Sequence, residues 1–241
     1  MPDQHWVTLQ SGGEMRAHVS LPSEGVGFGA GVVIIHGGWG IEPGLMLLPK
    51  RLVYAGYAAI IPDMYHRDSE AQAQQKPLER IARLTWDGAR SDVEAALQHL
   101  RAQGCNRIAV LGFCMGGALA LMCGATLDFR TAVLFYPHEV FGPFGGDRIV
   151  PFELAPQLKV PVLGHFGADD KNPSPDDMHK LDAALTAQGT PHQFYTYDGA
   201  GHGFALQAEG RPSYRAIPAN ISFDRTIGWF DRHLRNVPAP V

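Results

Sequence analysis

Five short, almost uninterrupted apolar segments restrict the fold of this chain more than any other feature of its sequence. Each is rich in β-branched, aromatic or small apolar residues and is too short for a typical helix. Such strands are typical of a parallel sheet that is covered on both faces. They occupy residues 30–36, 57–62, 107–113, 131–137 and 160–167.

Helical patterns alternate with these strands along the chain. We expect a sixth strand at 192–197 and helices at 45–54, 78–103, 115–125, 175–188 and 223–234. Two alternating segments, 5–10 and 14–21, flank Ser11-Gly12-Gly13 and predict an antiparallel hairpin. The sequence therefore predicts one α/β domain over residues 1–241, with a mainly parallel central sheet flanked by helices and an N-terminal hairpin.

Composition excludes several classes of partner. Hydrophobic residues make up 45% of the chain and charged residues 18%, which is enough to build a large core. The formal net charge of −4 gives no reason to expect nucleic acid or an anionic membrane as partner, and no apolar run is long enough to span a membrane. We expect a monomer or a small homo-oligomer that acts on a small molecule.

The cysteines and the first residues indicate the compartment. Three cysteines, Cys105, Cys114 and Cys123, make neither a disulfide framework nor a zinc motif, so a reducing environment fits best. The first ten residues show no basic segment followed by an apolar stretch, so we expect no signal peptide. These features favour a cytoplasmic protein.

The segment Gly112-Phe113-Cys114-Met115-Gly116 has the spacing of a nucleophile elbow, with cysteine as the nucleophile. It joins an expected strand to an expected helix. The strained turn requires residues as small as glycine two positions before and after the nucleophile. Cys114 would then lie at a helix N-terminus, which stabilises a thiolate. The alternative is that Cys114 is a small buried apolar residue.

A thiol nucleophile needs a base and a group that orients the base. Asp170 follows the strand at 160–167, and His202 follows the strand at 192–197, so the order is nucleophile, acid, histidine. Asp169 is the competing acid. Taken singly, Asp170 could be a helix cap and His202 a surface histidine, but the ordered set predicts a Cys114–His202–Asp170 triad.

The remaining site residues come from loops beside the elbow. The backbone N–H of Met115 would face a developing oxyanion, and His36-Gly37-Gly38-Trp39-Gly40 would supply a second donor at Gly38. Trp39 is either a wall of the substrate pocket or a core residue. The set His36, His138, His165 and His202 lacks metal-binding spacing, and no glycine-rich nucleotide motif is present, so we expect neither a metal nor a cofactor.

With these residues identified, the chain resembles the dienelactone hydrolase (carboxymethylenebutenolidase) family of α/β-hydrolases over nearly its whole length. The most specific match is GFCMGG, and GYAAIIPDMYHR, FGADD and GAGHGFA also match. The resemblance implies an α/β-hydrolase fold. It also implies a Cys114, His202 and Asp170 triad with donors at Gly38 and Met115, and its register favours Asp170 over Asp169. Phe204, in the matched histidine loop, is a candidate for the substrate pocket together with Trp39.

Three positions depart from the family's type members. Those members carry a glutamate where this chain has Gly37, a serine where it has Gly203, and a substrate-binding arginine where it has Leu206. Glu42 lies nearby but does not match the register. The resemblance therefore implies hydrolysis of carboxylic esters or lactones in general, through a thioester. A non-catalytic binding or scaffold relative and an acyltransferase are the alternatives.

Overall fold

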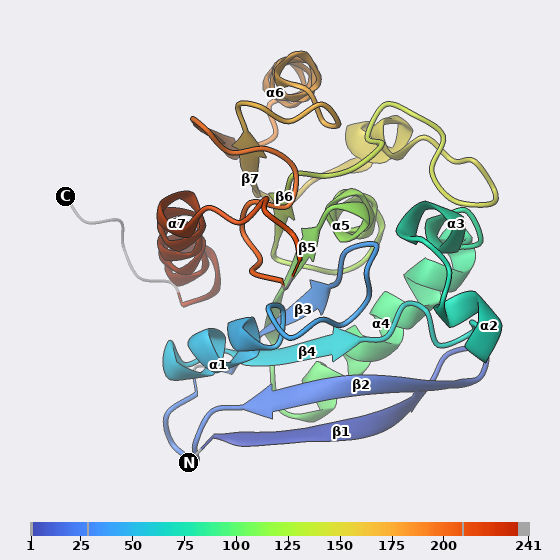
Figure 1. Ribbon diagram of the computed structural model, residues 1–241. Coiled ribbons are helices and arrows are strands. Elements are labelled where there is room, and N and C mark those ends of the chain that lie inside the picture. Colours follow the sequence, from blue (N-terminus) through green and yellow to red (C-terminus); the bar gives the residue numbers. More distant parts are fainter. Residues whose placement is uncertain (1, 28, 209, 236–241) are drawn as a thin grey trace.

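The computed structural model describes residues 2–27, 29–208 and 210–235. Its centre is an eight-stranded sheet with the spatial order β1-β2-β4-β3-β5-β6-β7-β8 (Figure 1). The strands are β1 (Asp3–Gln10), β2 (Glu14–Leu21), β3 (Ala30–Ile35), β4 (Ala58–Pro62), β5 (Arg107–Phe113), β6 (Thr131–Phe135), β7 (Val162–Gly167) and β8 (His192–Tyr197).

The strand directions match the expectation from the sequence. β1 and β2 form an antiparallel hairpin, and β2 also pairs antiparallel with β4. Every other neighbouring pair, from β4 to β8, is parallel. The prediction of a mainly parallel sheet with an N-terminal antiparallel hairpin is confirmed.

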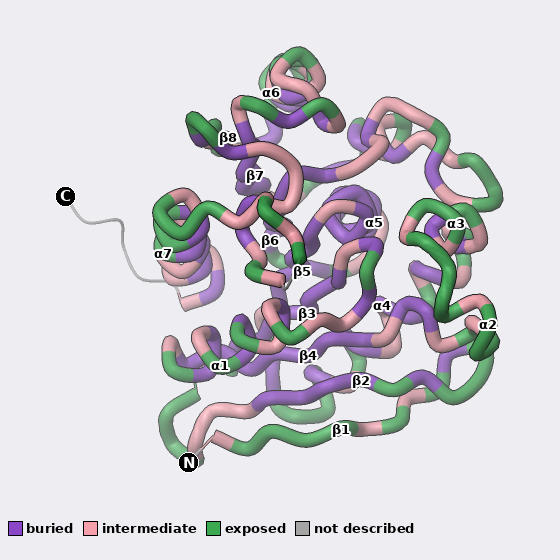
Figure 2. The backbone as a smooth tube through the Cα atoms, viewed as in Figure 1, coloured by how far each residue is buried: buried purple, intermediate pink, exposed green. Residues whose placement is uncertain are grey.

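Helices cover both faces of the sheet. One face is covered by α1 (Leu47–Tyr54) and α7 (Ala216–Leu234), and the other by α4 (Trp86–Ala102), α5 (Met115–Thr126) and α6 (Pro175–Ala187). Because side chains alternate along a strand, Val33 packs into one core while Val32 packs into the other. Figure 2 shows the resulting burial of the central strands. No helix among the described residues is long and apolar enough to cross a membrane.

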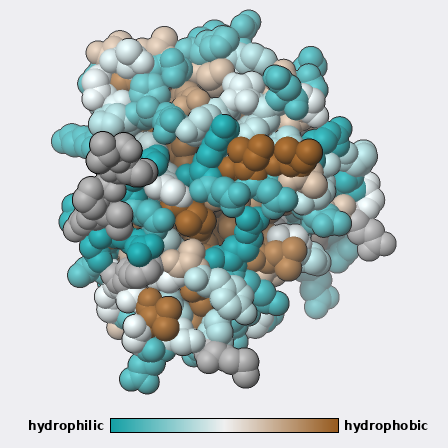
Figure 3. Space-filling view, turned by 90° about the vertical axis from the view of Figure 1, so that its left-hand side faces the viewer, coloured by the Kyte–Doolittle hydropathy of each residue, from teal (hydrophilic) through white to brown (hydrophobic). Residues whose placement is uncertain are grey.

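The side of the molecule formed by α1 and α7 exposes single apolar side chains rather than one continuous surface. Leu47, Ile217 and Ile221 are exposed on these two helices. In Figure 3 the apolar side chains of this side lie in separate patches among hydrophilic ones.

The prediction of one continuous helix at 78–103 is wrong. The segment is divided into α3 (Pro77–Ile81) and α4, which begins at Trp86. The side chain of Thr85 caps α4 by accepting a hydrogen bond from the amide of Gly88 (3.3 Å). The carbonyl of Leu84 accepts instead from the amide of Gly146 in a distant loop (2.7 Å). A local cap and a long-range contact together outweigh the continuous helical pattern.

Smaller differences occur at other element ends. The last helix begins at Ala216 rather than 223. Its first two turns carry exposed isoleucines, so they lack the apolar pattern by which the later turns were predicted. β6 ends at Phe135 rather than 137, since Tyr136 has a positive φ of 37° and leaves the extended conformation. Two short helices, α2 (Glu70–Ala73) and η1 (Pro151–Gln157), were not expected.

Candidate active site

Cys114 occupies a sharp turn between β5 and α5. Its φ of 56° and ψ of −118° lie outside the usual regions for a residue with a side chain. A Cβ added at Gly112 would lie 1.8 Å from the carbonyl oxygen of Gly116, and one added at Gly116 would lie 2.3 Å from that of Ile35. The turn can therefore form only with glycine at both positions, which is the physical reason for the spacing in the sequence.

His202 and Asp170 form a hydrogen-bonded pair in the cleft that Cys114 also lines. Nδ1 of His202 lies 3.0 Å from Oδ2 of Asp170, and Oδ1 of Asp170 accepts from the amide of Asn172, also at 3.0 Å. Asp170 is 2% exposed, whereas Asp169 is exposed and only lines the cleft. Of the two candidate acids, Asp170 is thus the one placed against the histidine.

The loop that carries His202 can approach β7 closely because Gly167, at the end of β7, has no side chain. A Cβ at Gly167 would lie 2.4 Å from the carbonyl oxygen of Ala200, and that carbonyl accepts the amide of Asp169 at 2.9 Å. The loops after β7 and β8 are therefore tied to each other, which brings His202 and Asp170 together over the elbow.

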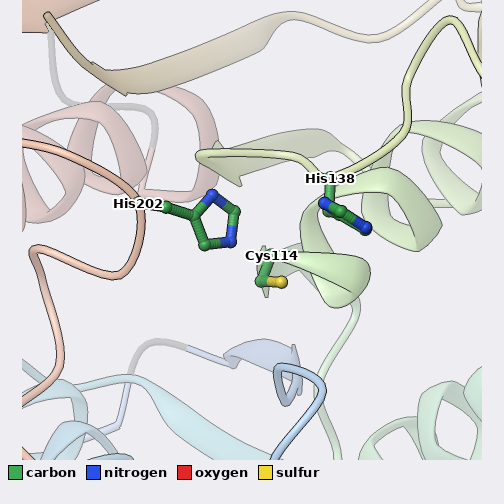
Figure 4. Close-up of side chains that lie close together, drawn as sticks. All are labelled: Cys114, His138 and His202. Atoms are coloured by element: carbon green, nitrogen blue, oxygen red, sulfur yellow. The ribbon is translucent and has the colours of Figure 1, made fainter. Parts of the chain in front are cut away.

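The thiol lies close to two histidines. Sγ of Cys114 and one ring nitrogen each of His138 and His202 all lie within 4.8 Å of one another, and all three residues are partly exposed. In Figure 4 the sulfur lies between the two rings, with His202 reaching in from the loop after β8 and His138 from the loop after β6.

The surroundings of His202 favour its protonated form. Burial lowers its pKa, but the hydrogen bonds to Asp170 and Cys114 and the negative charges of both residues outweigh burial and raise the pKa to about 10. The imidazole is consequently positively charged near neutral pH, between a carboxylate and the sulfur. Burial and the charge of His202 instead lower the pKa of His138.

The loop after β3 supports the backbone donors expected for an oxyanion. His36 is fully buried, its Nε2 accepts from the amide of Met64 (3.0 Å), and the Tyr65 hydroxyl donates to the carbonyl of Gly38 (3.1 Å). Among the described residues, neither the Gly38 amide nor the Met115 amide donates to a backbone carbonyl in a turn or loop. Neither amide is committed to such a bond, so both stay candidates for the oxyanion donors that the sequence predicts.

A cleft of about 410 Å³ opens at the thiol, beside a second hollow of about 130 Å³. Both are lined by Gly38, Trp39, Cys114 and His202. Trp39, 57% exposed, is thus a wall of the cleft rather than a core residue. Phe204 lies elsewhere: it is fully buried with its ring against Tyr136 and Tyr197, so its expected place in the substrate pocket is wrong.

Two groups at the cleft, His138 and Arg211, were not among the predicted site residues. His138 follows the carboxyl end of β6, so the rule that led to Asp170 and His202 could have identified it. Arg211 lines the smaller hollow, where it forms an ion pair with Glu42, and its guanidinium lies over the Trp39 ring, 5.3 Å from the ring centroid. It lies late in the long connection between β8 and α7, well beyond the end of the strand, and no pattern in the sequence marked it.

The other two histidines of the four weighed as metal ligands serve the core. His165 is fully buried and contacts the hydroxyls of Tyr197 and Thr226 at 2.9 and 3.0 Å. His36 holds the loop after β3, as described above. Those four histidines therefore do not form one cluster, although two of them converge on Cys114.

Comparisons with known proteins agree with this architecture. The model of the dienelactone hydrolase family matches residues 15–234. The chain is 30% identical to a carboxymethylenebutenolidase from Rhodococcus opacus over 219 residues, covering 88% of this chain and 84% of that protein. It is also 30% identical to a candidate 2-oxo-3-(5-oxofuran-2-ylidene)propanoate lactonase from Bradyrhizobium, over 95% of this chain and 94% of that protein.

A solved structure gives the same result. The crystal structure of a candidate dienelactone hydrolase from Klebsiella pneumoniae superposes with a TM-score of 0.84 at 25% identity, covering 96% of this chain and 99% of that one. The expected α/β-hydrolase fold is confirmed. Fold, family match and relatives all agree, and the chain belongs to the dienelactone hydrolase family and is a hydrolase of that type.

Proposed function

We propose that this protein hydrolyses carboxylic esters or lactones, with Cys114 as nucleophile, His202 as acid and base, and Asp170 as the group that orients His202. One observation carries the proposal: a strained cysteine faces an imidazole whose other nitrogen lies 3.0 Å from a buried carboxylate. This is the arrangement that nucleophilic catalysis requires.

The first half of the reaction transfers the acyl group to the enzyme. The proton of Cys114 passes to His202, and the resulting thiolate attacks the acyl carbon and breaks the carbonyl π bond. The amides of Gly38 and Met115 stabilise the oxyanion, and loss of one such donor costs roughly 3 kcal/mol. Collapse of the intermediate expels the alkoxide, which takes the proton from His202, and leaves a thioester on Cys114.

The second half returns the enzyme to its starting state. Neutral His202 removes a proton from water, and the resulting hydroxide attacks the thioester carbonyl. The same amides stabilise the second oxyanion. The carbon–sulfur bond then breaks, the carboxylic acid leaves, and the proton remains with the Cys114–His202 pair. Asp170 holds the imidazole in the orientation that both halves need.

The cleft indicates what part of a substrate fits beside the thiol. The side chains of Trp39, Pro77, Leu78 and Ile81 line the larger cleft, and Leu78 is 66% exposed. An apolar acyl or aryl group would cover these side chains and remove them from water. We therefore expect esters and lactones with an apolar substituent to bind better than their short polar analogues.

The compartment and the chain's organisation complete the proposal. A thiolate mechanism requires a reduced cysteine, so we infer a cytoplasmic enzyme. We also infer that residues 1–241 act as a single catalytic domain, because loops from β3, β5, β7 and β8 together form the site.

The test is a panel of aryl esters and lactones assayed with Cys114→Ala, His202→Ala and the matched control His179→Asn. His179 is exposed on α6, away from the cleft. We expect each site variant to lose at least about 10³-fold in kcat/KM, because the nucleophile and its base act as one unit. The control should retain activity. Wild-type turnover by Cys114→Ala or His202→Ala would refute the mechanism.

A further inference from the structure

Three metal-ligating atoms converge at the active-site thiol. Sγ of Cys114 and one ring nitrogen each of His138 and His202 lie within 4.8 Å of one another. On one tetrahedral Zn²⁺ such atoms are about 3.3 to 3.6 Å apart, given the usual zinc–sulfur and zinc–nitrogen bond lengths. All three side chains are partly exposed, so small side-chain rotations can close the difference (Figure 4).

The hydrogen bonds that hold the two histidines in place suit metal binding. Asp170 holds Nδ1 of His202 at 3.0 Å, which leaves Nε2 as the nitrogen available to a metal. A carboxylate behind a coordinating histidine is the usual outer contact of a zinc site. The amide of His138 donates to the carbonyl of Cys114 (3.0 Å), so the loop that carries the second histidine is fixed to the elbow.

Access and charge also suit a metal ion. All three residues line the cleft of about 410 Å³, which has room for water as a fourth ligand. Besides the thiolate, the buried carboxylate of Asp170 supplies negative charge next to the site. A ligand set of one sulfur and two imidazoles selects zinc, cadmium or cobalt over magnesium and calcium, which prefer oxygen.

We propose that Cys114, His138 and His202 form a reversible binding site for Zn²⁺ or a similar thiophilic divalent cation. Binding forms one metal–sulfur and two metal–nitrogen bonds and releases one proton from the Cys114–His202 pair to solvent. A sulfur bound to the metal cannot attack an acyl carbon, so the bound ion switches hydrolysis off. This last clause rests on the proposed function, whereas metal binding itself does not.

The spacing of these residues in the sequence could not reveal such a site. The three ligands come from loops after β5, β6 and β8, and only the parallel sheet brings them together. His138 distinguishes this site from the proposed catalytic triad, because it contributes a ligand without belonging to the triad.

The experiment titrates the chelator-washed full chain with Co²⁺ and then with Zn²⁺ in competition with a chromophoric chelator. We expect one Co²⁺ per chain with a near-ultraviolet band from thiolate to cobalt, and displacement of that ion by Zn²⁺. His138→Asn should weaken Zn²⁺ binding at least about tenfold, and Cys114→Ser should remove the band. The matched control His179→Asn should bind as the wild type does.

The outcomes separate this site from the proposed function. Absence of the band in the wild type, or unchanged Zn²⁺ affinity in His138→Asn with a native circular dichroism spectrum, would overturn the metal site. If His138→Asn fails to fold, His202→Asn replaces it with the same expected loss of affinity. Metal binding without any ester or lactone hydrolysis by the metal-free chain would leave the site standing and refute the proposed function instead.

Discussion

At the scale of the residue, the proton on His202 connects the chemistry of the site with the stability of the fold. Burial alone would lower the pKa of this imidazole, yet its bonds to Asp170 and Cys114 raise the pKa to about 10. The unfolded chain would hold that proton only up to about 6.5. Between these values His202 is protonated in the folded chain and neutral in the unfolded chain, so the stability that this residue contributes falls as the pH rises.

This difference in proton binding predicts how His202→Asn changes thermal unfolding. The stability that the protonated histidine contributes is fully present below about pH 6.5 and is lost as the pH approaches 10. The difference in Tm between wild type and His202→Asn should therefore be largest near pH 6 and shrink steadily towards pH 10. Differential scanning calorimetry measures it, with His179→Asn as control. A difference that stays constant or grows with pH would be inconsistent with a raised pKa.

Leu78 offers a test of the apolar wall. Its side chain is 66% exposed at the mouth of the larger cleft and would be covered by an apolar substituent of the substrate. Leu78→Gln should raise KM for apolar aryl esters about fivefold, which corresponds to about 1 kcal/mol of lost apolar burial, and should leave kcat nearly unchanged. Leu47→Gln, at a leucine that is 56% exposed and lies outside that cleft, is the control. Equal KM values for both variants would remove Leu78 from the binding surface.

At the scale of the element, the strands were predictable and one long helix was not. Continuous apolar runs such as β3 reveal a buried parallel strand, because both faces of the sheet are covered. The division between α3 and α4 depends on a hydrogen bond from Gly146 to Leu84, which is made 62 residues along the chain (146 − 84). Local periodicity contains no information about such a contact. The same division places Pro77 and Ile81 against Gly38, so it also shapes the cleft.

The elbow predicts a sharp difference between two glycines. Gly112→Ala would place a methyl group 1.8 Å from the Gly116 carbonyl oxygen, so it should destabilise the fold by at least about 2 kcal/mol and reduce activity. Gly228→Ala, within α7 and with no atom within 4 Å of the added Cβ, should be neutral or stabilising by up to about 1 kcal/mol. Urea unfolding compares the two. Equal free energies of unfolding would mean that the elbow is not tightly packed.

At the scale of the whole molecule, the sheet itself assembles the site. The loops after β3, β5, β7 and β8 begin at one edge of the sheet, where the carboxyl ends of these strands lie. The places of Gly38, Cys114, Asp170 and His202 could therefore be predicted from their order along the chain. The sequence could not show which aromatic side chains face the cleft. Trp39 and Phe204 both lie beside predicted site residues, yet Trp39 lines the cleft and Phe204 fills the core.

The central claim is that the folded protein forms a covalent intermediate on Cys114. Trapping that intermediate tests the claim most directly. Wild-type enzyme is mixed with an activated aryl ester, quenched in acid within the first turnovers and analysed by intact-mass and peptide mass spectrometry. We expect one added acyl group, carried as a thioester by Cys114 and absent from Cys114→Ala. Rapid hydrolysis with Cys114 unmodified, or with the acyl group on another residue, would contradict the account.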